Sequence, residues 1–257
     1  MRIGVAGING RVGSVLIEAI RQRGDQLTGG FDRPGAGRQA PAPDITLFHS
    51  LEELAAVSDV VVDFTVAAAV TAHSNAISRH RAAWVLGTTG LSEAAQLGVV
   101  QAARHVPVVQ AANFSPGVTL VLDLAARLAA ALPPEDYDAE IVDMHHRQKL
   151  DAPSGTALAI GNAVAAARGT TLAAVRDSGR DGVTSARATG AIGFASLRGG
   201  QVVGEHTVLF TASDEQIGLT HRAFDRRTFA AGAIRAAHWA HGRPPGLYSM
   251  RDVLGLR

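Results

Sequence analysis

The stretch RIGVAGINGRVG, residues 2 to 13, decides the fold. A short apolar run leads directly into three glycines, and a helical pattern follows over about 12–23. Glycines between a strand and a helix let backbone N–H groups approach a pyrophosphate at the positive end of the helix. The spacing is GxxGxxG rather than GxGxxG, and glycines also form ordinary tight turns, so the flanking strand and helix carry the prediction of a dinucleotide-binding motif. The three glycines are Gly7, Gly10 and Gly13.

Strand-like and helical segments alternate through the rest of the first part of the chain. This alternation predicts an α/β fold with a Rossmann-like, doubly wound parallel sheet. The stretch PGAGRQAPAP at 34–43 predicts a mobile loop. We expect strands at 2–6, 26–31, 59–64, 83–86 and 107–110, and helices at about 67–79 and 93–104.

The pattern changes after NFSPG at 113–117. Strands now follow one another without intervening helices, which predicts a second α+β domain built on a mixed or antiparallel sheet. We therefore expect a dinucleotide-binding domain of residues 1–116, completed by 229–257, and a second domain of residues 117–228. The expected elements of the second part are helices at 118–132, 154–168 and 228–241 and strands at 138–145, 191–197, 202–210 and 215–222.

Composition excludes several classes of protein. A chain of 257 residues with 47% hydrophobic and 18% charged residues is typical of a globular protein. The net charge of +1 predicts no nucleic-acid partner, and the sequence has neither a membrane-spanning run nor a signal peptide, so we expect a cytoplasmic protein without a membrane partner. The absence of cysteine rules out disulfides, thiolate metal sites and thiol nucleophiles.

Asp32 lies 19 positions after Gly13, where the acidic residue of a dinucleotide site is expected. Its carboxylate could accept hydrogen bonds from both ribose hydroxyls, and the adjacent Arg33 could pair with a 2′-phosphate. Together they predict a site for NADH or NADPH and leave the choice open. The alternative is an exposed turn before Pro34.

Two further motifs, GTTG at 87–90 and AANFSPG at 111–117, follow predicted strands. Ligands in open α/β sheets bind at the carboxyl ends of the strands, so both motifs are candidates for cofactor contacts, although ordinary loops have similar compositions. Asp63-Phe64-Thr65 ends a strand in the same way, and the phenyl ring suits either a nicotinamide contact or the core.

The segment DMHHRQKLDAPSGTALA, residues 143 to 159, contains Lys149, the one lysine among 24 lysines and arginines. Arginine does not release its proton at accessible pH, whereas lysine and histidine can, so His145, His146 and Lys149 are candidate proton donors. The lone lysine could also be an accident of an arginine-rich composition. Glu205-His206 could assist a metal site, but no HExxH-like pattern exists and we expect no metal.

The same segment predicts an anion pocket. Ser154 follows Pro153 and is a good helix N-cap. Gly155 and Thr156 would form the first turn of the helix, with their backbone amides free. Amides and hydroxyls at the positive end of a helix suit a carboxylate.

Taken in order, these motifs resemble the 4-hydroxy-tetrahydrodipicolinate reductase (dihydrodipicolinate reductase) family over nearly the whole chain. The long string HHxxKxDAPSGTA makes the resemblance specific. The motifs that carry it are GxxGRxG at 7–13, GTTG at 87–90, ANFS-G ending at Gly117, HHxxKxDAPSGTA at 145–157 and VGEHT at 203–207.

The resemblance implies NADH- or NADPH-dependent reduction of (2S,4S)-4-hydroxy-2,3,4,5-tetrahydrodipicolinate to tetrahydrodipicolinate, with release of water, in the diaminopimelate route to lysine. It implies that His145 donates or accepts a proton and that Lys149 is the second donor. It also implies a homotetramer assembled through the sheet of the second domain. The substrate dicarboxylate would be held by His146, Ser154, Gly155 and Thr156, and the cofactor by Gly7, Ile8, Asn9, Gly10, Arg11, Val12, Asp32, Arg33, Gly87, Thr88, Thr89, Ala111, Ala112, Asn113 and Phe114.

Two other classes compete with this interpretation. Dehydrogenases of the homoserine or aspartate-semialdehyde type share such a first domain, but the latter needs a nucleophilic cysteine and neither explains HHxxKxDAPSGT. A non-catalytic dinucleotide-sensing module would have no use for proton donors beside an anion pocket.

Overall fold

The computed structural model describes residues 1–33 and 40–256. The chain forms two compact units: residues 1–116 with 226–257, and residues 117–225. The chain returns to the first unit three residues earlier than the expected 229. Of the loop expected at 34–43, residues 34–39 lie outside the described residues.

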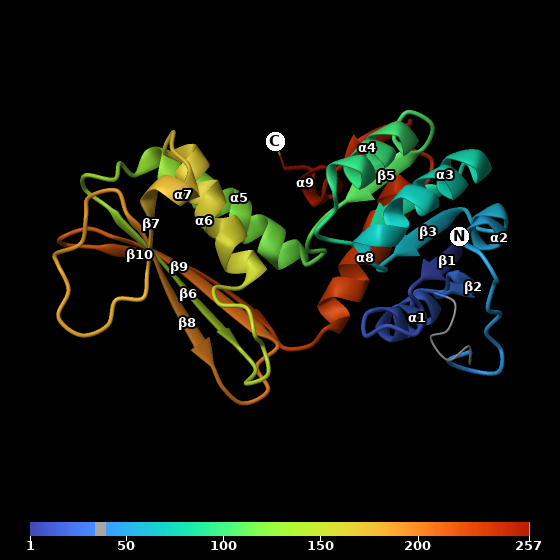
Figure 1. The fold of residues 1–257 in the computed structure, drawn as a ribbon, viewed down its shortest axis with the longest axis horizontal. Helices are drawn as coiled ribbons and strands as arrows, with labels where there is room; N and C mark the ends of the chain where they lie inside the picture. The colour runs from blue at the N-terminus through green and yellow to red at the C-terminus, as the bar shows by residue number, and fades with distance from the viewer. Residues whose placement is uncertain (34–39, 257) are drawn as a thin grey trace. The chain divides into compact units, whose positions relative to one another are not determined.

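The first unit contains a six-stranded sheet whose strands are all parallel (Figure 1). Because β1 lies between β2 and β3, the chain changes direction across the sheet at β1, and ligands of doubly wound sheets bind at such a switch point. The sheet order is β11-β5-β4-β3-β1-β2, with β1 at Arg2–Ala6, β2 at Gln26–Phe31, β3 at Val60–Asp63, β4 at Ala83–Leu86, β5 at Pro107–Gln110 and β11 at Gly246–Tyr248.

Helices cover both faces of this sheet, so its central strands β1, β3 and β4 are buried on both sides. Ile3 and Val5 of β1 face one core cluster and Ala6 faces the other, as the alternation of side chains along a strand requires. The predicted Rossmann-like class is confirmed. The helices are α1 (Gly13–Gln22), α2 (Leu51–Ala56), the 3₁₀ turn η1 (Ala67–Ala69), α3 (Val70–His80), α4 (Glu93–Ala102), α8 (Arg227–Ala240) and α9 (Met250–Leu254).

The second unit contains a five-stranded mixed sheet, also as predicted. Its central strand β6 runs parallel to β8 and antiparallel to β9. The order is β10-β9-β6-β8-β7, with β6 at Asp138–His145, β7 at Arg176–Ser178, β8 at Ile192–Arg198, β9 at Gly204–Thr211 and β10 at Gln216–Ala223. Its helices are α5 (Pro116–Ala131), α6 (Gly155–Ala167) and α7 (Leu172–Val175).

The two faces of this second sheet differ. On one face Ile141 and Val208 pack with α5 and α6 into a core and are almost completely buried. On the other face Met144 and Leu209 are half-buried, and Leu197 is 50% exposed. One face therefore builds the core and positions the site, and the other presents apolar side chains at the surface of the unit.

Five short elements escaped the sequence prediction: α2, α7, α9, β7 and β11. Segments of three to six residues contain too few side chains to display a helical or strand period, and their neighbours in space define them. Within the described residues, no helix is long and apolar enough to cross a membrane.

Candidate active site

The glycine loop after β1 requires its glycines. Gly7 has φ of +79°, and a Cβ on it would lie 2.7 Å from the carbonyl oxygen of Phe64. A Cβ on Gly13 would lie 2.2 Å from the carbonyl oxygen of Gly7, so the first turn of α1 packs directly on the loop. Gly10 is exposed. The loop thus brings its backbone to the surface at the start of α1.

Two cavities, of about 320 and 410 Å³, open beside this loop. Nine of the predicted cofactor residues line them: Gly7, Gly10, Arg11, Val12, Asp32, Arg33, Gly87, Thr88 and Thr89. The other six do not. Ile8 is fully buried in the core, and Asn9 lines a third cavity of about 180 Å³ together with Asp32. Ala111, Ala112, Asn113 and Phe114 line none of these three, and Phe114 packs edge-on against Phe64 with ring centroids 5.5 Å apart.

Asp32 lies just beyond the end of β2. Its carboxylate accepts hydrogen bonds from the backbone N–H groups of Asn9 at 3.2 Å and Arg33 at 2.8 Å. These contacts fix the carboxylate beside the glycine loop. Arg33 is exposed and lines the same cavity, so an anionic and a cationic group are available there together.

Sequence reasoning missed several residues that line these cavities, among them Phe31, Val66 and His73. His73 comes from α3, and its Nδ1 lies 2.8 Å from Oδ2 of Asp63, which is fully buried. The Thr65 hydroxyl donates to the same carboxylate at 2.7 Å. The strand-ending Asp63-Phe64-Thr65 was a signal for this edge of the sheet, but nothing in the sequence pairs His73 with it.

The residues of the first unit fit a bound dinucleotide. Among the described residues, no side chain caps α1, so its first amides remain available to a phosphate. The Oγ1 of Thr88 is buried and has no hydrogen-bond partner within the described part of the chain, although Thr88 lines the larger of the two cavities. Buried hydroxyls are normally satisfied, so this one indicates a place for a ligand.

In the second unit, β6 ends at His145 and points it to the same face as Asp143, two residues earlier. The Nδ1 of His145 lies 3.0 Å from Oδ2 of Asp143. Ser196 donates to the other carboxylate oxygen at 2.6 Å, and Arg198 donates to Oδ2 at 3.0 Å. Both come from β8, whose parallel register places Ser196 beside Asp143 and Arg198 beside His145.

The electrostatics of this cluster follow from its burial and charges. Burial by itself would raise the pKa of Asp143, but the Ser196 hydroxyl and the Arg198 charge outweigh it and hold this pKa below its usual range. Burial lowers the pKa of His145, and the positive charge of Lys149 lowers it further, against the opposing effect of Asp143. His145 is therefore tuned to give up a proton more readily than an exposed histidine.

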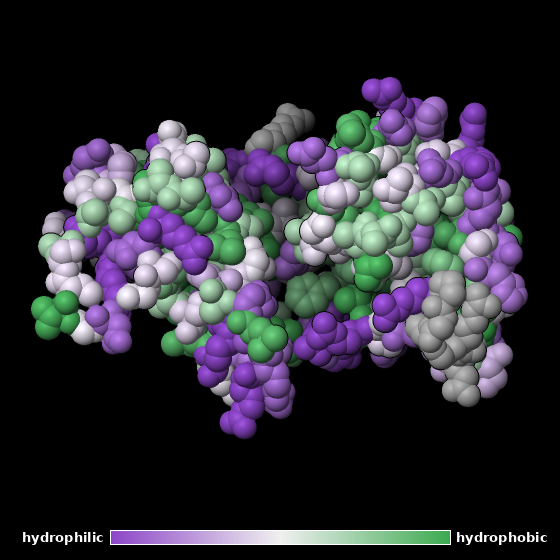
Figure 2. All heavy atoms as spheres, viewed as in Figure 1, coloured by the Kyte–Doolittle hydropathy of each residue, from purple (hydrophilic) through white to green (hydrophobic). Residues whose placement is uncertain are grey.

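The loop after β6 carries the other predicted proton donors. Figure 2, in the view of Figure 1, shows a hydrophilic surface where β6 and β8 end. Lys149 Nζ donates to Oδ1 of Asp151 at 2.9 Å, and this contact lowers the pKa of the exposed Asp151 carboxyl. Arg198 Nη2 donates to the backbone carbonyl of Asp151 at 2.7 Å. His146 is half-buried, and its Nδ1 has no partner in the part of the chain that the structure describes.

Ser154 caps α6, as the sequence predicts. Its hydroxyl accepts a hydrogen bond from the Ala157 N–H at 3.2 Å and lies 3.1 Å from Nε2 of His206 on β9. The rings of His206 and His145 contact each other edge-to-face, with centroids 5.1 Å apart. Burial lowers the pKa of His206 to about 4, with help from the charge of His145. His206 is thus neutral at neutral pH.

These contacts connect His145 to Ser154 through His206, and Lys149 to Arg198 through Asp151. The sequence pointed to His145, His146, Lys149, Ser154, Gly155 and Thr156 because they lie in one short segment, and their roles stay a prediction. Sequence reasoning missed Asp143, Ser196, Arg198 and the inward orientation of His206. A group of imidazoles, an ammonium and helix amides can bind an anion and transfer a proton.

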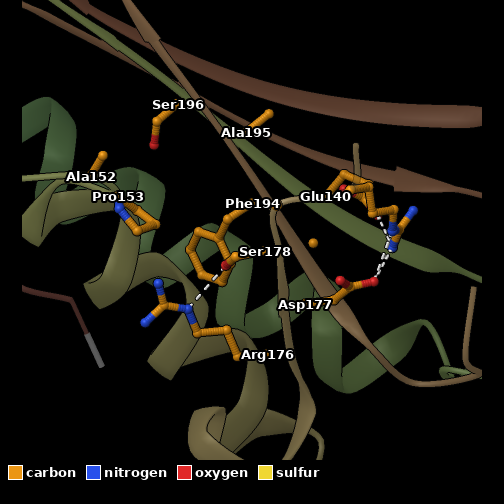
Figure 3. A pocket seen from close by; sticks show the side chains of 12 residues that line it. Glu140, Ala152, Pro153, Arg176, Asp177, Ser178, Phe194, Ala195 and Ser196 are labelled. Carbon is orange, nitrogen blue, oxygen red and sulfur yellow. Dashed lines mark hydrogen bonds and ion pairs between the residues drawn. The ribbon is translucent and has the colours of Figure 1, made fainter. Parts of the chain in front are cut away.

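Another cavity of the second unit, of about 430 Å³, lies between β7, β8 and the loop at 152–153 (Figure 3). Arg180 contacts both Asp177 and Glu140, whereas Arg176 Nε donates to the uncharged hydroxyl of Ser178 at 3.1 Å. The two carboxylates and two guanidiniums in the lining balance each other. This local neutralisation makes it a poorer site for a dianion than the histidine cluster.

The alternative of a metal site at Glu205-His206 fails on geometry. Neighbouring residues of a strand point to opposite faces, and Glu205 pairs with Arg222 at 2.9 Å while His206 faces the core. Within residues 1–33 and 40–256, no group of three or more histidines, aspartates and glutamates is placed to hold a metal.

A parallel dinucleotide-binding sheet and a separate unit with proton donors beside a helix N-terminus define an oxidoreductase that uses a nicotinamide dinucleotide. The family model described as "Dihydrodipicolinate reductase, N-terminus" matches residues 1–114. The model described as "Dihydrodipicolinate reductase, C-terminus" matches residues 117–254. The chain belongs to the dihydrodipicolinate reductase family. The predicted function, that of a reductase in lysine biosynthesis, is thereby confirmed.

Similar proteins agree with this assignment. The 4-hydroxy-tetrahydrodipicolinate reductase of Granulibacter bethesdensis is 58% identical over 257 residues, which cover 100% of this chain and 98% of that protein. The enzyme of the same description from Gluconacetobacter diazotrophicus is 59% identical over 256 residues, with coverages of 100% and 98%. A dipicolinate-bound dihydrodipicolinate reductase from Paenisporosarcina sp. TG-14 has the same fold, with a TM-score of 0.80 at 24% identity and 98% of each chain covered.

Proposed function

We propose that the chain reduces (2S,4S)-4-hydroxy-2,3,4,5-tetrahydrodipicolinate to 2,3,4,5-tetrahydrodipicolinate, with release of water, using either NADPH or NADH. The observation that carries the proposal is the cluster of His145, Lys149 and the capped start of α6 within one unit. A dicarboxylate substrate suits this cluster, and the similar enzyme from Paenisporosarcina sp. binds dipicolinate.

The second unit would bind and orient the substrate. His146 offers a half-buried imidazole, and Ser154, Gly155 and Thr156 form the start of α6, where the helix dipole favours a carboxylate. Ser154 holds the turn in place through its bond to Ala157. These four residues are the proposed carboxylate ligands.

The proton would come from His145 or Lys149. Bound NADPH or NADH supplies the hydride. Loss of the hydroxyl together with a hydrogen from the adjacent carbon releases water and leaves a conjugated C=C–C=N system. Addition of hydride to this system leaves negative charge, which one proton neutralises. His145 is buried with a lowered pKa, and Lys149 is held by Asp151 at 2.9 Å, so both are fixed donors.

Dual use of NADH and NADPH follows from the neighbouring Asp32 and Arg33. The carboxylate suits the ribose hydroxyls of NADH, and the guanidinium suits the 2′-phosphate of NADPH. Both residues line the cavity beside the glycine loop. We further propose that the enzyme acts in the cytoplasm as a homotetramer, assembled through the uncovered face of the second sheet.

The first experiment measures oxidation of NADPH and of NADH by the wild-type chain, with substrate produced in situ by the preceding synthase. Turnover with both nucleotides is expected. Binding of nucleotide without turnover would contradict the proposal and favour a dinucleotide-sensing module.

Lys149→Ala is expected to lower kcat by about 10²- to 10⁴-fold, the usual contribution of a positioned proton donor. The dissociation constant for NADPH, measured by fluorescence titration, should change less than about twofold, because the residues proposed to bind the nucleotide lie in the first unit. Lys149→Arg is the matched control: it keeps the charge but cannot release a proton, so it should not restore kcat. Normal kcat in either variant would remove Lys149 from proton transfer.

A further inference from the structure

We propose that Asp143 is a positioning residue for the reaction: it fixes the orientation and tautomer of His145 and holds this histidine in register with the start of α6. The inference rests on the proposed function, in which His145 exchanges a proton with the substrate.

The contacts of Asp143 support this role. Its side chain is 1% exposed, yet both carboxylate oxygens are used, by His145 and Arg198 on one and Ser196 on the other. A hydrogen bond from the backbone of Ser154 also stabilises the ionised carboxyl. One buried carboxylate therefore joins β6, β8 and the first residue before α6.

These contacts determine the tautomer of His145. An ionised carboxylate only accepts hydrogen bonds, so Nδ1 of His145 must carry the proton that points to Asp143. Nε2 is then the atom that exchanges a proton. Fixing one ring nitrogen through a carboxylate is a general means of orienting an imidazole for proton transfer.

The surroundings of Nε2 fit this assignment. Gly204 of β9 lies beside this nitrogen, and a Cβ added there would lie 3.1 Å from Nε2. The absence of a side chain at Gly204 therefore keeps β9 from crowding this nitrogen. Asp143 lies on one side of the ring, and an uncrowded nitrogen lies on the other.

The same cluster extends to the second proton donor. Arg198 donates from Nη1 to Asp143 and from Nη2 to the backbone carbonyl of Asp151, whose carboxylate accepts from Lys149. Arg198 is mostly buried, with 18% of its side chain exposed. Through Arg198, Asp143 is connected to the loop that holds Lys149 as well as to His145.

Asp143→Asn tests the proposal because it preserves size while removing the charge. The amide can donate to Nδ1, which would move the proton of neutral His145 to Nε2, so that Nε2 could no longer take up the proton that it must deliver to the substrate. We expect kcat to fall about 10- to 100-fold while KM changes less than about threefold, consistent with an indirect share of a proton-transfer step.

A double-mutant cycle separates positioning from a merely structural role. If Asp143 acts through His145, then Asp143→Asn should change kcat less than about twofold in a His145→Ala background. An equal loss in both backgrounds would overturn the proposal. Inactivity of the wild-type chain toward the substrate would instead overturn the proposed function, so the two failures are distinguishable.

The titration of His145, followed by NMR of its ring, gives a readout that needs no turnover. The charged and titratable groups that act on His145 are Asp143 on β6, Arg198 on β8, His206 on β9 and Lys149 in the following loop. Asp143 is the group among them that raises the pKa of His145, so Asp143→Asn should shift the titration to lower pH. An unchanged titration would contradict the contact that the proposal needs.

Ser196 provides a milder test in case Asp143→Asn folds poorly. Ser196→Ala removes one hydrogen bond to the carboxylate and should lower kcat about two- to tenfold, whereas Ser196→Thr keeps the hydroxyl and should retain activity. Equal activities of the Ala and Thr variants, with wild-type kcat in both, would count against the positioning role.

Discussion

Gly204 shows how the absence of one side chain leaves room for a proposed proton donor, His145. It begins β9 and is buried, and its backbone lies outside the left-handed region, so alanine is sterically possible for the main chain. The cost arises at the neighbouring ring, because the new methyl group would lie 3.1 Å from Nε2 of His145 and 3.6 Å from Cε1 of His206. Any side chain at position 204 would therefore press on the imidazoles of His145 and His206, although the backbone would tolerate it.

We expect Gly204→Ala to lower kcat by roughly tenfold, since the imidazole must shift by a few tenths of an ångström away from its productive position. The control is Gly218→Ala on β10, where the added Cβ would meet the flexible end of Leu209 at 3.3 Å. Steady-state kinetics of both variants check the prediction. Equal kcat for the two would show that Nε2 tolerates the methyl group.

The residues around His145 also show which parts of the proposed site cannot be predicted from the sequence. His145, Lys149 and Ser154 lie within one segment of ten residues and formed a recognisable motif. Ser196 and Arg198 come from a strand about fifty residues later and reach Asp143 only through the register of β6 and β8. No spacing in the sequence encodes such a pairing, so these partners became visible with the fold.

At the scale of elements, β9 places the neutral His206 next to the start of α6. His206 is 5% exposed, and its Nε2 lies 3.1 Å from the hydroxyl of Ser154. Its pKa is about 4 in the fold, against an ordinary histidine value of 6.5. Between these pH values the unfolded chain binds more protons than the folded one, so the stability that this neutral histidine supports is present above about pH 6.5 and is lost as the pH falls towards 4.

The expected loss at pH 5 is about 2 kcal/mol of unfolding free energy, and roughly 3 kcal/mol by pH 4. Urea unfolding followed by circular dichroism at pH 7 and pH 5 measures it. His206→Gln should reduce the difference between the two pH values, whereas His105→Gln, at an exposed position, should leave it nearly unchanged. The same pH dependence in all three proteins would show that His206 does not carry the effect.

Elements differ in how well the sequence predicts them. The longer strands and helices fell within a few residues of their expected bounds, because β6 and α1 display complete periods of buried residues. β11 could not be predicted: Gly246–Tyr248 is only three residues long and is a strand because β5 is beside it. Its pairing partner lies more than a hundred residues earlier, so tertiary contacts define it.

At the scale of the molecule, the chain forms two compact units, one with the dinucleotide-binding fold and the other with the proposed proton donors. The second unit uses one face of its sheet for the core and the cluster at Asp143. The opposite face carries Leu197, which is 50% exposed, and half-buried side chains such as Val142, Met144 and Leu209. Apolar side chains in a row on an open sheet are typical of a surface that is buried in an oligomer.

The wild-type chain should therefore have the mass of four chains in sedimentation equilibrium, and Leu197→Glu should lower the mass at micromolar concentration. A carboxylate at this position would have to be buried without a partner in the assembled protein. Leu97→Glu is the matched control, since Leu97 is 61% exposed but belongs to α4 of the first unit. A monomeric wild-type chain, or equal masses for wild type and Leu197→Glu, would show that this face does not assemble the oligomer.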